Sequence, residues 1–130
     1  MPREPDPVLR RLRALCLALP EAEEVESFGH PGWRVRKKGF AYYERYQGED
    51  CIVFKAELPV QQALVKSPRF FTAPYIGKHG WVSLRCSSRL DWKEIADLVG
   101  GSWRLVAPKR LVSGARSRSA RPPAARPRAR

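Results

Sequence analysis

Few side chains in this sequence could carry out acid–base or nucleophilic chemistry. His30 and His79 are the candidate proton donors and acceptors, and Ser27, Ser83 and Cys51 are the candidate nucleophiles. No nucleophile elbow, phosphate-binding glycine loop or paired metal-ligand motif accompanies them. Both histidines lie in turns rich in glycine or proline, where an imidazole more often satisfies local backbone groups. We therefore expect a protein that is not an enzyme and needs no cofactor.

Two further groups of residues could bind a metal ion or form disulfides. The only dense acidic run comprises Glu21, Glu23, Glu24 and Glu26. Carboxylate oxygens suit hard cations, but a short run of this kind points in several directions, so solubility or pairing with basic residues is the expected role. The cysteines are Cys16, Cys51 and Cys86, an odd number without a Cys-x-x-Cys pair. They are expected to be buried free thiols in a reducing cytoplasm, with no metal site.

Positive charge is the strongest compositional signal. The chain has 25 Lys and Arg against 13 Asp and Glu, a formal net charge of +12. Eight of these basic residues and no acid follow Ala107, so 17 basic and 13 acidic residues leave +4 for the rest. A basic surface predicts binding to nucleic-acid phosphates, with little preference for sequence because no base-reading motif is present. The candidate binding residues are Arg34, Arg36, Lys37, Lys38, Lys78, His79, Arg85, Arg116, Arg118 and Arg121.

A protein-interaction module is the alternative function. Aromatic side chains dominate the energetics of many interfaces, and Trp33, Trp81 and Trp103 are either core residues or exposed anchors. The partner would then bind the open face of the sheet or the corner from Tyr75 to Trp81. A basic open face would favour nucleic acid, helped by an exposed aromatic such as Tyr43, and an apolar face would favour a protein partner.

The periodicity predicts helices alternating with short strands. Asp6 and Pro7 begin a helix that extends to about residue 18, and Asp91 caps another helix that Gly100-Gly101 is expected to loosen or break. A short helix is expected from Pro59 to Val65. The strands are expected at residues 24–28, 33–37, 40–46, 51–55 and 81–86, with a brief extended segment at 69–72 and tight turns at 29–32, 38–39, 47–50 and 77–80.

Alternation within the strand after Gly80 predicts the two faces of the sheet. Val82, Leu84 and Cys86 share an apolar face, whereas Trp81, Ser83 and Arg85 share a face that is expected to be polar and basic. The hairpin tip at residues 37–39 is expected to form a basic, wing-like projection. No apolar run approaches the ~20 residues of a membrane-spanning helix, and the N-terminal residues do not have the pattern of a signal peptide, so a cytoplasmic protein, with a monomer favoured, is expected.

The chain divides by composition at about residue 112. Residues 1–112 contain the periodic segments and form one predicted α+β domain. Residues 113–130 consist mainly of Arg, Ala, Ser and Pro without aromatic residues, so they cannot bury enough apolar area to offset their conformational entropy. They are expected to form a disordered basic tail.

Several short signatures occur in an order that resembles the MmcQ/YjbR family of small bacterial proteins. They are Leu19-Pro20 with the acidic run, Phe28-Gly29-His30-Pro31, Trp33-Arg34-Val35, Lys38-Gly39-Phe40-Ala41, Phe54-Lys55, the stretch from Ala73 to Val82, and the closing stretch from Leu98 to Leu111 with Ser102-Trp103. The resemblance covers about residues 7–111. It implies a two-layer α+β sandwich in which an antiparallel sheet of five or six strands is backed by helices, similar to frataxin-like and secretion-chaperone-like folds. Family members are often labelled DNA-binding because of a double-wing arrangement, and this label implies the same role here.

Overall fold

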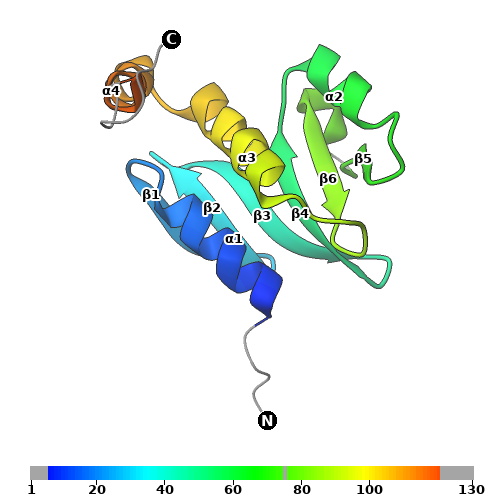
Figure 1. Cartoon of the computed structure of the whole chain (residues 1–130). Coiled ribbons are helices and arrows are strands. Elements are labelled where there is room, and N and C mark those ends of the chain that lie inside the picture. The colour runs from blue at the N-terminus through cyan, green and yellow to red at the C-terminus, as the bar shows by residue number, and fades with distance from the viewer. Residues whose placement is uncertain (1–5, 75, 121–130) are drawn as a thin grey trace.

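Six strands form one antiparallel sheet in the order β1-β2-β3-β4-β6-β5 (Figure 1). The computed structural model describes residues 6–74 and 76–120, with the side chains of 115–120 left aside. The helices are α1 (Pro7–Leu17), α2 (Leu58–Leu64), the 3-10 turn η1 (Gly77–His79), α3 (Trp92–Val106) and α4 (Lys109–Ala120). The strands are β1 (Ala22–Ser27), β2 (His30–Val35), β3 (Lys38–Tyr46), β4 (Glu49–Lys55), β5 (Phe70–Thr72) and β6 (Trp81–Arg85).

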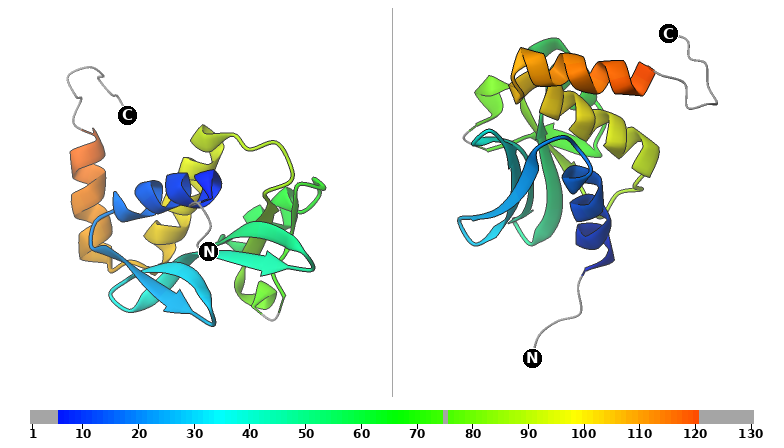
Figure 2. Two further views of the ribbon diagram at one scale, coloured as in Figure 1. Left: turned by 90° about the horizontal axis from the view of Figure 1, so that it is seen from below. Right: turned by 90° about the vertical axis from the view of Figure 1, so that its left-hand side faces the viewer.

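Helices α1 and α3 cover the same face of the sheet (Figure 2). The predicted α+β fold with two layers and about six antiparallel strands is therefore confirmed. Both helices begin where the sequence predicts, because Asp6 accepts a hydrogen bond from the Val8 amide at 2.9 Å and Asp91 accepts from the Lys93 amide at 3.1 Å. Within the described residues, no helix is both long and apolar enough to cross a bilayer.

Three two-residue turns join β1 to β4. Cross-strand pairs flank each turn: Ser27 with His30, Val35 with Lys38, and Tyr46 with Glu49. The turn residues Phe28-Gly29, Arg36-Lys37 and Gln47-Gly48 all have φ between +50° and +88°, which is the left-handed geometry of type I′ hairpins. The predicted turns at 29–32 and 38–39 are therefore wrong in position, since β2 begins at His30 and β3 at Lys38.

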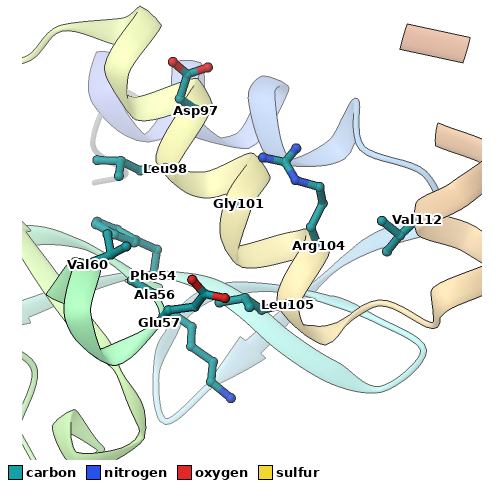
Figure 3. A pocket seen from close by; sticks show the side chains of 11 residues that line it. Phe54, Ala56, Glu57, Val60, Asp97, Leu98, Gly101, Arg104, Leu105 and Val112 are labelled. Carbon is teal, nitrogen blue, oxygen red and sulfur yellow. The ribbon is translucent and has the colours of Figure 1, made fainter. Parts of the chain in front are cut away.

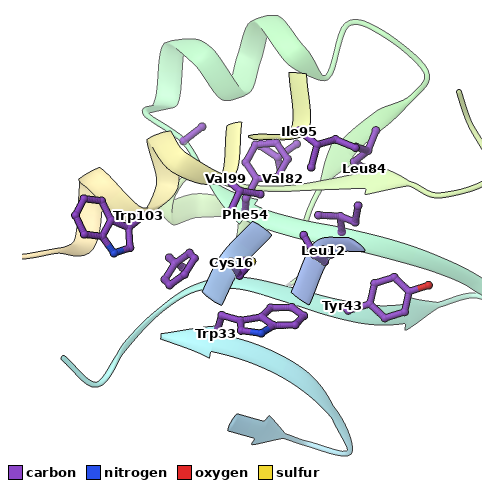
Figure 4. Close-up of a cluster of buried hydrophobic side chains, with 14 of the residues drawn as sticks. Leu12, Cys16, Trp33, Tyr43, Phe54, Val82, Leu84, Ile95, Val99 and Trp103 are labelled. Atoms are coloured by element: carbon purple, nitrogen blue, oxygen red, sulfur yellow. The ribbon is translucent and has the colours of Figure 1, made fainter. Parts of the chain in front are cut away.

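Trp33 and Trp103 belong to the core between the sheet and the two helices (Figure 4). Both are buried, as core residues, whereas Trp81 is partly exposed on the other face of the sheet. The predicted break of the third helix at Gly100-Gly101 is wrong, because α3 continues to Val106. The residues after the two glycines anchor it: the Trp103 indole donates to the Pro20 carbonyl oxygen at 3.1 Å, and Ser102 is completely buried.

The C-terminal segment differs in part from the disorder predicted for it. Helix α4 continues through residues 113–120, where Ala, Arg and Ser are compatible with a helix and no proline interrupts it before Pro122. Residues 121–130 lie outside the described residues, so their disorder and the domain boundary at 112 stay predictions. Tyr75, part of the corner expected to bind a partner, also lies outside them.

Candidate nucleic-acid interface

The strand register brings basic residues from distant parts of the chain to one end of the sheet. Neighbouring strands are antiparallel, so the ends of β2 and β4 lie beside the starts of β3 and β6. Lys55 pairs with Trp81, directly after η1, and Val35 pairs with Lys38 across the hairpin. The C-terminal end of α3 lies at the same end, because the Ser102 hydroxyl accepts a hydrogen bond from the Lys55 amide at 2.9 Å. We call the resulting group the basic end: Arg36, Lys37, Lys38, Lys55, Lys78, His79, Arg104 and Lys109.

A depression of about 620 Å³ lies within the basic end, between the β2–β3 hairpin and the α3–α4 connection. Its charged lining consists of Arg36, Lys38, Arg104 and Lys109. Leu105 and Val112 add an apolar part to the wall. Figure 1 shows α4 and the C-terminal end of α3 at this end of the sheet. Four cations thus surround one hollow of the surface, an arrangement that suits a phosphate or another anion.

Most cations of the basic end are not neutralised by a carboxylate. Arg36 is the exception, since its guanidinium binds the Glu21 carboxylate and lowers the pKa of Glu21 below its usual range. Among the described residues, the following cations of the basic end form no ion pair: Lys37, Lys38, Lys55, Lys78, Arg104 and Lys109.

Two other predicted binding residues have structural partners elsewhere. Arg34 donates to Glu23 at 3.2 Å on the exposed sheet face. Arg85 lies at the opposite end of the sheet, donates to Glu49 at 2.8 Å and to the Pro68 carbonyl oxygen at 3.0 Å, and its guanidinium lies 4.6 Å from the centre of the Phe71 ring. The structure therefore does not bring Arg34 or Arg85 to the basic end. Arg116 and Arg118 lie on α4, and Arg121 is outside the described residues.

Three of the four glutamates of the acidic run pair with arginines and do not converge on a metal site. Glu21 binds Arg36, Glu23 binds Arg34, and Glu24 accepts from Arg13 at 2.8 Å and from the Trp33 indole at 3.0 Å. The Arg13 guanidinium lowers the pKa of Glu24. In the part of the chain that the structure describes, no three His, Cys, Asp or Glu residues are placed to hold a metal ion.

The face of the sheet opposite α1 and α3 is aromatic, which corrects the prediction of a polar, basic face. Tyr42 and Trp81 have ring centroids 5.5 Å apart, and Tyr46 and Phe71 are stacked at 5.6 Å. Ser83 on this face is buried. A second apolar cluster of Cys51, Val53 and Ala73 lies beneath these rings, and this is the reason that the face is not polar. We call Tyr42, Tyr46, Phe71 and Trp81 the aromatic face.

Tyr43 does not belong to this exposed set. Its side chain is buried in the core, and its hydroxyl donates to Asp6 at 2.7 Å. Burial and this hydrogen bond raise the pKa of Tyr43 above its usual range. The expectation of an exposed Tyr43 that stacks on bases is therefore wrong.

The candidate catalytic residues are not assembled into a reactive group. Ser27 and His30 are cross-strand neighbours, but among the described residues no side-chain hydrogen bond joins them. His30 Nε2 is 4.0 Å from a Glu44 carboxylate oxygen, and its buried Nδ1 has no hydrogen-bond partner. His79 is exposed on η1 at the other end of the sheet.

The cysteines are free thiols without activation. Cys16 and Cys51 are buried, and Cys86 is half-buried. Burial raises the pKa of Cys51 to about 11 and that of Cys86 to about 12, so both thiols are protonated at neutral pH and are poor nucleophiles.

The sequence analysis did not single out Lys55, Arg104 and Lys109, which complete the basic end. Lys55 ends β4, and 25 residues separate it from β6, the neighbouring strand in the sheet. Arg104 could be assigned to the basic end only with the knowledge that α3 continues past its two glycines. The short turns could have revealed the β2–β3 and β3–β4 pairing, and hence the shared end of Lys38 and Lys55.

The fold defines a class of small α+β proteins with an antiparallel sheet that helices cover on one face. The YjbR family model matches residues 17–105, more than half of the chain. The chain therefore belongs to the YjbR family, as its sequence signatures indicate.

Solved structures show the same fold. A Deinococcus radiodurans protein with a DUF419 domain superposes with a TM-score of 0.66 at 19% identity, covering 82% of this chain and 83% of that one. A Pseudomonas syringae protein determined by a structural genomics consortium gives a TM-score of 0.59 at 19% identity, covering 66% of this chain and 87% of that one. No curated protein matches the sequence.

Proposed function

We propose that this protein is a non-catalytic nucleic-acid-binding protein that contacts the phosphate backbone through the basic end. The supporting observation is that described cations without ion-pair partners gather on the β2–β3 turn, β3, β4, η1, α3 and α4. The basic end extends across the sheet from β2 to β6, over three strand spacings of about 4.8 Å each, or roughly 14 Å. This length is sufficient to contact several successive phosphates.

The charges at the opposite end of the sheet also favour binding of nucleic acid at the basic end. At the opposite end, Arg45 is paired with Asp50 at 2.9 Å and Arg85 with Glu49 at 2.8 Å. Glu44 adds a further carboxylate on that side of the sheet, next to His30. A polyanion would therefore be attracted to the end of Lys38 and Lys78 more strongly than to the other end, where the arginines are neutralised by carboxylates.

Binding of a labelled duplex across a salt series tests this function. Six phosphate contacts would give a slope of about −5 in a plot of log affinity against log salt. Deletion of residues 121–130 separates the contribution of the terminal arginines from that of the basic end. Retained, salt-dependent binding by the shortened chain supports the proposal, whereas loss of all binding would place the activity in the tail alone.

A second candidate function is recognition of a protein partner by the aromatic face. Tyr42, Tyr46, Phe71 and Trp81 are partly exposed, and Phe28 at the β1–β2 turn is 98% exposed. Aromatic clusters of this kind are typical of interface hot spots. Replacing Tyr46 by serine would weaken a protein complex without changing the salt-dependent binding of nucleic acid, and this difference separates the two functions.

A further inference from the structure

An apolar groove of about 400 Å³ lies between α2 and α3, next to the basic end (Figure 3). Its apolar lining consists of Phe54, Ala56, Val60, Leu98, Leu105 and Val112. Val60 and Leu105 are each 42% exposed, although they are large apolar side chains. Binding sites for small molecules have this size and a mainly apolar lining with a few polar groups.

Gly101 forms part of the groove wall on α3. A Cβ atom at this position would meet only the Arg104 guanidinium, at 3.9 Å, so alanine would fit without a clash. Glycine in a helix interior costs about 1 kcal/mol relative to alanine. Packing against the rest of the protein does not require this glycine. The absence of a side chain at this position leaves space in the groove.

The groove continues into the cationic depression of the basic end. Arg104, Leu105 and Val112 line both hollows. One continuous site is therefore apolar between the helices and positively charged towards Lys38 and Lys109. A matching ligand has an apolar, compact part attached to a phosphate.

Two carboxylates in the groove indicate which kind of ligand group can bind there. Glu57 and Asp97 also line the groove. Lys55 and Arg104 balance the charge of these carboxylates in the lining. The carboxylates can accept hydrogen bonds from the exocyclic amino group of cytosine, adenine or guanine, whereas an acyl chain has no donor to offer them. A base in a duplex is stacked and paired, so only an unpaired base can enter a groove between two helices.

We propose that the α2–α3 groove receives an unpaired base of single-stranded nucleic acid, whose adjacent phosphates contact Lys38, Arg104 and Lys109. This inference rests on the proposed function and narrows its substrate to a single strand. It also assigns Gly101 as the residue that admits the base.

The test measures binding of fluorescent 12-mers to the full chain: oligo-dC, oligo-dT, an abasic strand with the same phosphates, and a duplex. We expect oligo-dC to bind about five- to tenfold more tightly than the abasic strand, the lower part of the range for burying one base. Oligo-dT should lie between them, because thymine has no exocyclic amino group. Gly101→Leu fills the groove without a change of charge and should abolish the advantage of oligo-dC over the abasic strand.

Gly101→Ala is the matched control and should retain at least half of that advantage. If Gly101→Leu does not fold, as judged by its thermal transition, Val60→Phe fills the groove from the exposed side of α2 and replaces it. Equal binding of oligo-dC and the abasic strand, or an unchanged oligo-dC advantage in the filled variant, would overturn the inference and leave phosphate binding intact. Failure of all four probes to bind would contradict the proposed function as well.

Discussion

The Ser102 hydroxyl donates a hydrogen bond to the Phe40 carbonyl oxygen at 2.6 Å, joining α3 to β3 across 62 positions of the chain. The Ser102 Oγ atom also accepts a hydrogen bond from the Lys55 amide at 2.9 Å, so one buried hydroxyl connects α3 with two adjacent strands. This contact fixes the C-terminal end of α3 at the basic end and thereby positions Arg104.

Replacement of Ser102 by alanine should destabilise the fold. The change leaves the buried Phe40 carbonyl and Lys55 amide groups without this partner, at a cost of about 1–3 kcal/mol. Urea denaturation measures the loss. Ser113→Ala, at an exposed position of α4, is the control and should change the free energy of unfolding by less than about 0.5 kcal/mol. Equal midpoints for the two variants would contradict the assigned role of Ser102.

Two glycines should respond in opposite directions to alanine. Gly80 has φ +98°, and a Cβ there would clash with the Ala56 carbonyl oxygen, so Gly80→Ala should cost roughly 2 kcal/mol or more. Gly101→Ala adds a methyl group in open space within a helix and should stabilise the protein by up to about 1 kcal/mol. Thermal unfolding of both variants checks the signs, and a destabilised Gly101→Ala would mean that this wall of the groove is packed.

Phe28 is expected to limit the stability of the β1–β2 hairpin. It has φ +50° at the first position of a type I′ turn. Its side chain is 98% exposed, so burial of the ring does not offset this unfavourable backbone conformation. Asparagine tolerates this conformation much better, so Phe28→Asn should stabilise the protein by about 0.5–1 kcal/mol. Phe28→Ala, which removes the ring without favouring the turn, is the comparison. A lower melting temperature for Phe28→Asn would show that the ring has a packing role.

Glu24 should make stability depend on pH in the acidic range. Its pKa is lowered in the folded state by hydrogen bonds from Arg13 and Trp33, so its contribution is present above its unfolded pKa of about 4.3 and is lost as pH falls through the lower folded pKa. Glu24→Gln should therefore lower the free energy of unfolding by about 1 kcal/mol at pH 7, a modest loss because the carboxylate is partly exposed. The loss should become progressively smaller below about pH 4. Unfolding curves at pH 7 and pH 3 measure the difference. A constant difference at both values would contradict this linkage.

Local signals predicted the fold well, and long-range contacts account for what they missed. Asp6 and Asp91 marked helix starts through capping, and strand alternation located β3, β4 and β6. The Arg36-Lys37 turn contains no glycine, so its left-handed geometry had no sequence signal. The continuity of α3 depends on Ser102 and Trp103 contacts with distant segments, which outweigh the low helix propensity of two glycines.

The candidate site was predicted in its composition more than in its arrangement. Lys37, Lys38 and Lys78 were identified as basic turn residues, and the register brings them to one end of the sheet. Arg85 was assigned by strand alternation alone, whereas its partners Glu49 and Phe71 come from other strands. The aromatic face escaped prediction for the same reason, since it combines two residues of β3 with one each from β5 and β6.

The most direct test of the basic end compares two double charge reversals with the same change in net charge. Lys38→Glu/Lys78→Glu alters the basic end, and Lys66→Glu/Lys93→Glu alters two exposed lysines elsewhere, on the segment after α2 and at the start of α3. Affinity for a labelled oligonucleotide is measured for both across a salt series. We predict a loss of at least tenfold and a salt slope shallower by about 2 for the first variant, and a much smaller loss with an unchanged slope for the second. Equal losses in the two variants would contradict a defined interface at the basic end and would leave only the net charge of the chain.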